Sequence, residues 1–208
     1  MTTIHATGTS EIHLRAERAT VTAGVSVTSR DRAESIAAAT RLHNWVVQRA
    51  EQLRASGDAT WHAADPVSTW SHKSYAEGTE QTVVIDHTTS SRVRVKLSNL
   101  DLVSEFVTEL SEAGLQTDVA WSLTEASRRA CERRARKAAV DEARAVADDY
   151  AEALGQRIAA VVSISDAPVG GGFPVQARFA AASFEGESAA VTVAEITVSA
   201  TVAGVYEA

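Results

Sequence analysis

The sequence predicts an α+β fold in which helices pack on a mainly antiparallel sheet. Several segments alternate apolar and polar residues with the period of a strand, and others repeat apolar residues every three or four positions, as helices do. The predicted order is ββαββαβαββ, with one long helix near residues 124–154. Helices placed between strand pairs are typical of an antiparallel sheet.

The first clear strand and the helix that follows it have strong local signals. Residues 20–27 place valines at alternate positions. Asp31 then begins a helix as its N-cap, with Glu34 as the other half of a capping box, and the helix ends near Gly57. Trp45 lies off its apolar side and is a candidate contact residue. The predicted apolar stripe of this helix is Ile36, Ala39, Val46, Val47, Ala50 and Leu53.

The middle of the chain predicts a hairpin, a short helix and another strand. Two strands are expected at residues 59–75 and 80–97, joined by a turn at Glu77–Gly78. Asn99 or Ser98 caps a short helix that ends at Gly114. A strand near 117–122 then leads to the long helix.

The long helix near residues 124–154 is bounded by two expected signals. Ser122 and Glu125 form a capping box at its start, and Gly155 ends it. Thirty residues span about 45 Å, so we expect the helix to kink or to extend beyond its own sheet. Its predicted inward stripe is narrow and made mostly of small residues: Cys131, Ala135, Ala139, Ala143, Val146, Tyr150 and Leu154.

The end of the chain predicts two further strand regions, at residues 158–165 and 189–206. In the second region the apolar residues change from odd to even positions between Val193 and Ile196. A strand with one buried face cannot change parity without an extra residue. We therefore expect a β-bulge or bend near Ala194–Glu195.

Composition limits the classes of protein to which the chain can belong. The 208 residues suit a single unit, or two intertwined subdomains formed by about 1–80 plus 156–208 and by about 81–155. A net charge of −7 argues against a nucleic-acid partner. A lone cysteine cannot form an intrachain disulfide. Without a signal-peptide pattern or a long apolar run, the sequence predicts a cytoplasmic protein with no membrane span.

One face of the long helix carries charges in a segregated order, with bases first and acids last. Two antiparallel copies of such a face would complement each other, as a two-fold interface requires. The alternative is a solvated face with internal pairs such as Lys137–Asp141 and Arg144–Asp148. The candidate interface residues, besides Trp45, are Arg129, Arg133, Lys137, Asp141, Arg144, Asp148 and Glu152.

Chemistry-bearing residues give weaker hypotheses. Cys131 lies among arginines near a helix start, which favours a reactive thiol, but the predicted stripe places it on the buried face. His62, His72 and His87 fall in the predicted hairpin region and could converge on a metal or small ligand, although their spacing matches no known metal motif. The sequence predicts no catalytic residues and no cofactor.

The ordered set of segments resembles the SIMPL-domain family over nearly the whole chain. The resemblance rests on "TGTSEIHLRAERATVTAGVSV", "SSRVRVKLSNLDLVSEFVTELSEAG", "RRARKAAVDEARAVADDYAEALG" and the following "QRIAAVVSISD". It implies an α+β fold and a tendency to form homo-oligomers. It also implies a loose link to stress tolerance and, in animals, to signalling scaffolds. An unidentified protein partner is the alternative to self-assembly. It supplies no catalytic residues.

Overall fold

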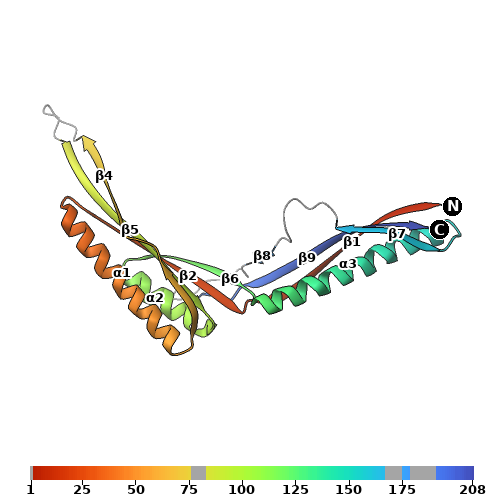
Figure 1. Ribbon diagram of the computed structural model, residues 1–208, viewed down its shortest axis with the longest axis horizontal. Helices are drawn as coiled ribbons and strands as arrows, with labels where there is room; N and C mark the ends of the chain where they lie inside the picture. The colour runs from red at the N-terminus through yellow and green to blue at the C-terminus, as the bar shows by residue number, and fades with distance from the viewer. Residues whose placement is uncertain (1, 76–82, 167–174, 179–190) are drawn as a thin grey trace, which may run out of the picture. The chain divides into compact units, whose positions relative to one another are not determined.

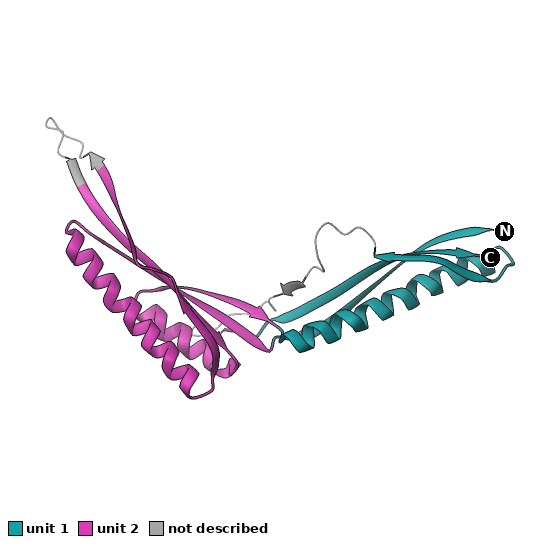
Figure 2. Cartoon of the chain, viewed as in Figure 1, with its two compact units in different colours: residues 1–16, 123–183, 192–208 teal, residues 17–122, 184–191 magenta. Residues whose placement is uncertain are grey.

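The computed structural model describes residues 2–75, 83–166, 175–178 and 191–208, and it confirms the α+β fold with antiparallel pairing (Figure 1). The chain divides into two compact units that interleave in sequence (Figure 2). Unit 1 comprises Met1–Ala16, Leu123–Ser183 and Thr192–Ala208, and unit 2 comprises Glu17–Ser122 and Phe184–Val191. The chain passes between the units after Ala16 and after Ser122, whereas the sequence suggested limits near residues 80 and 155.

Unit 1 is built on a long pair of strands with a helix along it. The sheet order is β1-β9-β7, and β8 also pairs with β9. Each of these pairings is antiparallel. The elements of unit 1 are β1 (Thr3–Arg15), α3 (Glu125–Ala153), β7 (Ala160–Asp166), β8 (Val175–Arg178) and β9 (Glu195–Glu207).

Of the β-bulge or bend expected near Ala194–Glu195, the bulge is absent from the pairing of β1 with β9. The register of β1 and β9 runs from Arg15↔Glu195 to Thr3↔Glu207 without a shift. β9 begins at Glu195, so the change of parity in the sequence falls just before the strand and needs no extra residue inside it. The backbone carbonyl of Ala194 accepts a hydrogen bond from the Ala16 amide at 3.0 Å.

The buried side of α3 consists almost entirely of alanine. Alanines follow Cys131 at every fourth position as far as Ala151, and each is at most 1% exposed. Each step of four residues advances about 40° beyond a full turn, so the contact line winds around the helix. A right-handedly twisted strand pair follows such a line because its own surface also turns along its length.

The predicted inward stripe of α3 is therefore wrong at its C-terminal end. Ala147 and Ala151 are buried there, whereas Tyr150 is 54% and Leu154 is 61% exposed. The close approach of β1 and β9 favours the smallest side chain at each contact, and the larger apolar residues lie on the flank. Similarly in α1, Ser35 is buried and Ile36 is exposed, because the Ser35 hydroxyl bonds Thr89 in the sheet at 2.6 Å.

The long helix has strand partners over its whole length. Its 29 residues span about 43 Å. β1 and β9 have 13 residues each and span a similar distance of about 43 Å. The expectation that this helix kinks or extends beyond its sheet is wrong because β1 and β9 are as long as the helix.

Unit 2 is a second sheet with helices on one face. The strand order is β3-β5-β2-β6, and β4 also pairs with β5. The expected strand at residues 59–75 is two strands, with Pro66 between them, and the expected turn at Glu77–Gly78 lies outside the described residues. The elements of unit 2 are β2 (Arg18–Ser29), α1 (Arg32–Ala55), β3 (Ala59–Ala64), β4 (Ser68–Tyr75), β5 (Val83–Leu97), the 3₁₀ turn η1 (Leu100–Leu102), α2 (Val103–Glu112) and β6 (Gln116–Ser122).

Helix ends follow the local signals with two exceptions, the N-cap of α3 and the second half of the capping box of α1. The Glu34 carboxylate accepts a hydrogen bond from the Ser29 hydroxyl, and the Asp31 amide donates to that hydroxyl rather than to Glu34. Asp31 caps α1 by accepting hydrogen bonds from the amides of Ala33 and Glu34. Gly155 follows α3 with a positive φ of 71°, as predicted for its end. The N-cap of α3 is Thr124, whose hydroxyl accepts from the Ser127 amide. Ser122, the expected cap, is still part of β6.

Asp58 joins the end of α1 to the end of β5 and should make unit 2 sensitive to acid. The hydroxyl of Ser56 and the amide of Asn99 donate to its carboxylate at 2.6 and 2.9 Å. These hydrogen bonds hold the pKa of Asp58 below its usual value. A lowered folded pKa stabilises the fold above the unfolded pKa of about 3.9, and that contribution is lost as the pH falls through the folded pKa.

Asp58→Asn is therefore expected to reduce the loss of stability between pH 5 and pH 2. Urea unfolding of both proteins across that range measures the difference. Asp149→Asn is the control, because Asp149 is exposed and its carboxylate makes no hydrogen bond among the described residues. An equal acid sensitivity of the native protein and Asp58→Asn would contradict this role.

Candidate functional site

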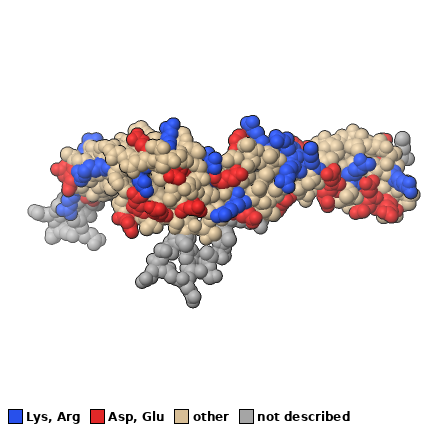
Figure 3. Space-filling view, turned by 90° about the horizontal axis from the view of Figure 1, so that it is seen from below, with Lys and Arg blue, Asp and Glu red and all other residues tan. Residues whose placement is uncertain are grey.

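The outward side of α3 presents the segregated charges as a continuous exposed surface. We call this surface the charged face of α3. All of its members are exposed because the alanines seat the opposite side of the helix on β1 and β9. In Figure 3, blue side chains gather over the first half of this helix and red ones lie nearer its C-terminal end. Its members are Arg129, Arg133, Lys137, Asp141, Arg144, Asp148 and Glu152.

Pairs within the helix neutralise part of this face. Arg129 Nε lies 2.6 Å from a carboxylate oxygen of Glu125, and Arg144 Nε lies 3.9 Å from Asp148. Among the described residues Lys137, Asp141 and Arg133 form no ion pair. The centre of the charged face therefore keeps its charges available to another molecule.

The first turns of α3 hold an ion-pair cluster that the sequence pattern did not reveal. Arg128 bonds both Glu125 and Glu132, and Glu132 is only 8% exposed. Hydrogen bonds from Arg128 and Arg129 lower the pKa of Glu125, and Glu125 in turn raises the pKa of Arg128. Glu125 also suits the positive end of the helix dipole. The basic start of this helix is thus compensated locally.

β7 is an exposed apolar strand at the edge of the unit 1 sheet. All seven of its residues are exposed, including Val161 at 49%, Val162 at 56% and Ile164 at 43%. Val161 is opposite Tyr206, so both residues lie on the sheet face that carries α3. The helix packs on β1 and β9 of that face and leaves β7 uncovered. Val162 occupies a register shift between Val161 and Ser163. Among the described residues, β7 pairs only with β9.

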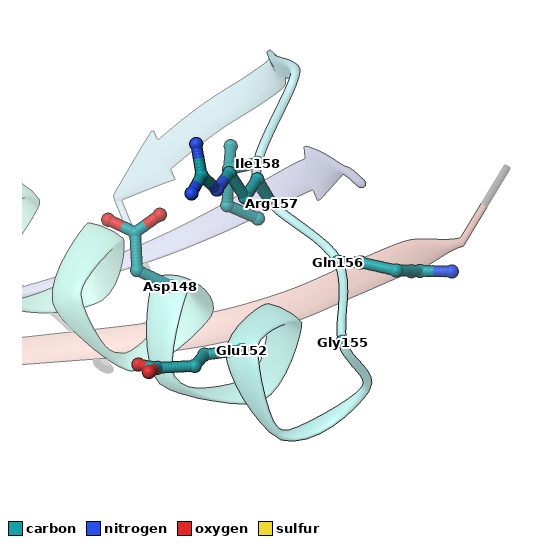
Figure 4. Close-up of a pocket in the computed structure, with 6 residues that line it drawn as sticks. All are labelled: Asp148, Glu152, Gly155, Gln156, Arg157 and Ile158. Atoms are coloured by element: carbon teal, nitrogen blue, oxygen red, sulfur yellow. The ribbon is translucent and has the colours of Figure 1, made fainter.

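A shallow polar hollow of about 500 Å³ lies where α3 turns back into β7. Figure 4 shows the Asp148 carboxylate and the Arg157 guanidinium extending on the same side of the link, with Gln156 pointing away. Glu152 adds a second carboxylate, and the positive φ of Gly155 permits the reversal of the chain. Among the described residues, the lining brings carboxylates and a guanidinium together but includes no hydroxyl or thiol.

The remaining candidates are not brought together. Trp45 is half-buried on α1. Cys131 is 4% exposed on the buried side of α3, where the predicted stripe places it. His62 is opposite Val95 on the helix-covered face, whereas His72 is opposite Asp86 on the other face. His87 Nδ1 and the Ser71 hydroxyl are hydrogen-bonded at 2.8 Å. Within the described part of the chain these histidines form no metal-binding cluster.

Sequence reasoning missed two exposed tryptophans in unit 2. Trp61 on β3 is 45% exposed and Trp70 on β4 is 51% exposed. Trp61 is opposite Lys96 and Trp70 is opposite Thr88 in the pairing with β5. Lys96 alternates with the buried Val95 and Leu97 and therefore faces away from the helices. Placing the tryptophans beside that outward face required the strand register.

Comparison with known proteins gives a family but no activity. The model of the SIMPL family, described as proteins of unknown function (DUF541), matches residues 4–206. No curated protein matches the sequence. Among the helices of the described residues, none is both long and apolar enough to cross a membrane. The match extends over both units, and the chain therefore belongs to the SIMPL family.

Proposed function

We propose that the protein is a non-catalytic interaction protein that assembles with copies of itself through unit 1. The observation that carries this proposal is β7, an apolar edge strand exposed on both faces. A free edge presents unpaired backbone N–H and C=O groups that readily pair with another chain. Soluble proteins normally protect such edges with charge, proline or a covering element. Over Ala160–Ser165, β7 carries no charge and no proline.

A second copy fits this edge because β7 can pair with itself. An antiparallel pair centred on Ser163 places Val162 of each copy opposite Ile164 of the other. Such a contact is isologous, as a two-fold dimer requires. It would bury apolar side chains that are about half exposed in the single chain. Burial of apolar surface is the dominant favourable term in association.

The charged face of α3 offers a second, separate contact between copies. Its available basic residues precede its acidic ones along the helix, so two antiparallel copies would place Arg133 and Lys137 near the partner's acidic end. Complementary charges of this kind set orientation and association rate more than affinity. The stress-related role belongs to this proposal only through the family resemblance.

Light scattering tests the apolar contact through the solution mass. The native protein is expected to form a defined oligomer, and Val162→Lys is expected to shift it to monomer because a charged edge strand resists pairing. Leu154→Lys is the matched control, since Leu154 is 61% exposed in the same unit but lies outside β7. A monomeric native protein, or equal effects of both variants, would overturn the proposed contact.

Salt dependence tests the charged face separately. Arg133→Glu is expected to weaken the oligomer at low salt and to have less effect at high salt, because salt screens exposed charges. Arg134→Glu makes the same charge change at an exposed position outside the charged face. An oligomer that is insensitive to both salt and Arg133→Glu would remove the charged face from the interface and leave β7 as its basis.

A further inference from the structure

The sheet of unit 2 has one face that no helix of the described residues covers. α1 and α2 pack on the other face (Figure 1). On β5, Val93, Val95 and Leu97 are fully buried beneath these helices. The residues that alternate with them must point to the uncovered face. These are Arg92, Arg94 and Lys96, which form a row of cations along the strand.

Strand register places two tryptophans on one side of this row of cations and threonine hydroxyls on the other side. Trp61 and Thr20 are opposite Lys96 on β3 and β2. Farther along β5 on the same face, Trp70 on β4 and Thr28 on β2 are opposite Thr88. Eight residues of β5 separate Lys96 from Thr88, which corresponds to about 26 Å along the strand. Both tryptophan side chains are about half exposed.

A polar hollow of about 400 Å³ lies in the sheet between these two tryptophans. Small residues on the central strands form its floor, including Gly24 on β2 and Ser90 on β5. Arg92, Asp65 and Gln116 bring a cation, a carboxylate and an amide to its rim. A concave site with a few convergent polar groups is typical of ligand recognition. Aromatic platforms at both ends indicate that the ligand is extended.

We propose that this face binds an acidic polysaccharide, a chain of sugar rings that carries carboxylates. The π face of tryptophan is electron-rich and attracts the C–H groups of a sugar ring. Arginine binds a carboxylate through parallel N–H bonds. The hydroxyls of β2 and the amide of Gln116 can exchange hydrogen bonds with sugar hydroxyls. Each of these contacts matches one chemical feature of the same ligand.

Nucleic acid fits this face less well. Arg94 is already paired with Asp65 at 2.7 Å. Asp118 is opposite Thr22 on β6 and adds another negative charge to the same face. Phosphate chains need a clear basic surplus, whereas the whole chain has a net charge of −7. A sugar chain also carries hydroxyls that can donate hydrogen bonds to the carboxylates of this face, which phosphate groups at neutral pH cannot do.

Isothermal titration of the full chain with a long oligogalacturonate tests the proposal. Trp61→Ala and Trp70→Ala are each expected to weaken binding about tenfold, as truncation of an aromatic anchor does. Arg92→Gln is expected to weaken binding to a similar degree. Tyr150→Ala and Arg134→Gln, which change an exposed aromatic and an exposed arginine of unit 1 outside the charged face, should bind like the native protein.

Other ligands and the solution mass complete the test. An uncharged glucan of the same length should bind at least tenfold more weakly, and equal binding would overturn the role of the cation row. Preferential binding of single-stranded DNA, with the same sensitivity to Trp61 and Trp70, would overturn the choice of ligand. Absence of binding to all three would overturn the site. The unit 2 variants should have the same oligomeric mass as the native protein. Failure of polysaccharide binding is therefore distinguishable from failure of self-assembly.

Discussion

Gly8→Ala is expected to lower the free energy of unfolding by at least about 3 kcal/mol, since overpacking against fixed atoms is costly. Gly8 lies in β1 where α3 passes closest to the sheet. A Cβ atom at this position would overlap the carbonyl oxygen of Ala139 and the backbone nitrogen of Ala143, and would lie 2.9 Å from Ala143 Cα. These are backbone atoms, so relief requires moving the helix away from the strands.

Gly24→Ala is the matched control for Gly8→Ala. Gly24 also lies within a strand, but its added Cβ would have no contact nearer than 3.5 Å, to Gln116 Cβ. Thermal unfolding should show a fall in Tm of roughly 6–12 °C for Gly8→Ala and little change for Gly24→Ala. Similar midpoints for the two variants would show that the helix does not seat on β1 in the way described.

Tyr206→Ala is expected to cost about 3–5 kcal/mol, the usual loss for a large buried aromatic. The ring is 1% exposed and packs with Ile4, Ala147 and Ala151 between the sheet and α3. It also lies over Gly204, whose missing side chain leaves room for it, because a Cβ there would be 2.5 Å from the ring. Removing the ring opens a cavity that surrounding alanines cannot fill.

Tyr206→Phe separates the ring from its hydroxyl. That hydroxyl is buried and has no hydrogen-bond partner among the described residues. An unsatisfied buried polar group is costly, so its removal should leave the unfolding free energy unchanged or slightly higher. Urea unfolding of both variants at pH 7 gives the comparison. A large loss in Tyr206→Phe would mean that the hydroxyl makes a stabilising hydrogen bond.

Local sequence signals predicted where helices begin and end, because these limits depend on residues that are neighbours in the sequence. Asp31 and Gly155 mark helix limits by hydrogen bonding and backbone conformation within a few residues. The buried side of α3 was harder to predict. A hydrophobicity pattern predicts that Tyr150 and Leu154 are buried and that Ala147 and Ala151 are not. Burial is decided instead by how close the helix lies to the strands. That distance depends on Gly8 and its neighbours in β1.

The candidate sites were predictable only where one element defines them. The charged face follows from the helix period alone. Exposure of Val162 and Ile164 depends instead on how far α3 extends across the sheet, which no local pattern encodes. The placement of Trp61 and Trp70 on one face of the sheet depends on the register of β3 and β4 with β5. A shift of one residue would move each side chain to the other face.

The interleaving of the units has a consequence for how the protein is made. β9 lies between β1 and β7 in its sheet, yet it follows both of them in the sequence. β1 therefore has no strand partner until synthesis reaches residues 195–207, whereas β2 to β6 are complete by residue 122. The sheet of unit 2 can fold on the ribosome before β1 and α3 have β9 as their partner. When β1 pairs with β9, the inserted residues 17–122 are already folded. The flexible loop that this pairing must close is therefore shorter than the number of intervening residues.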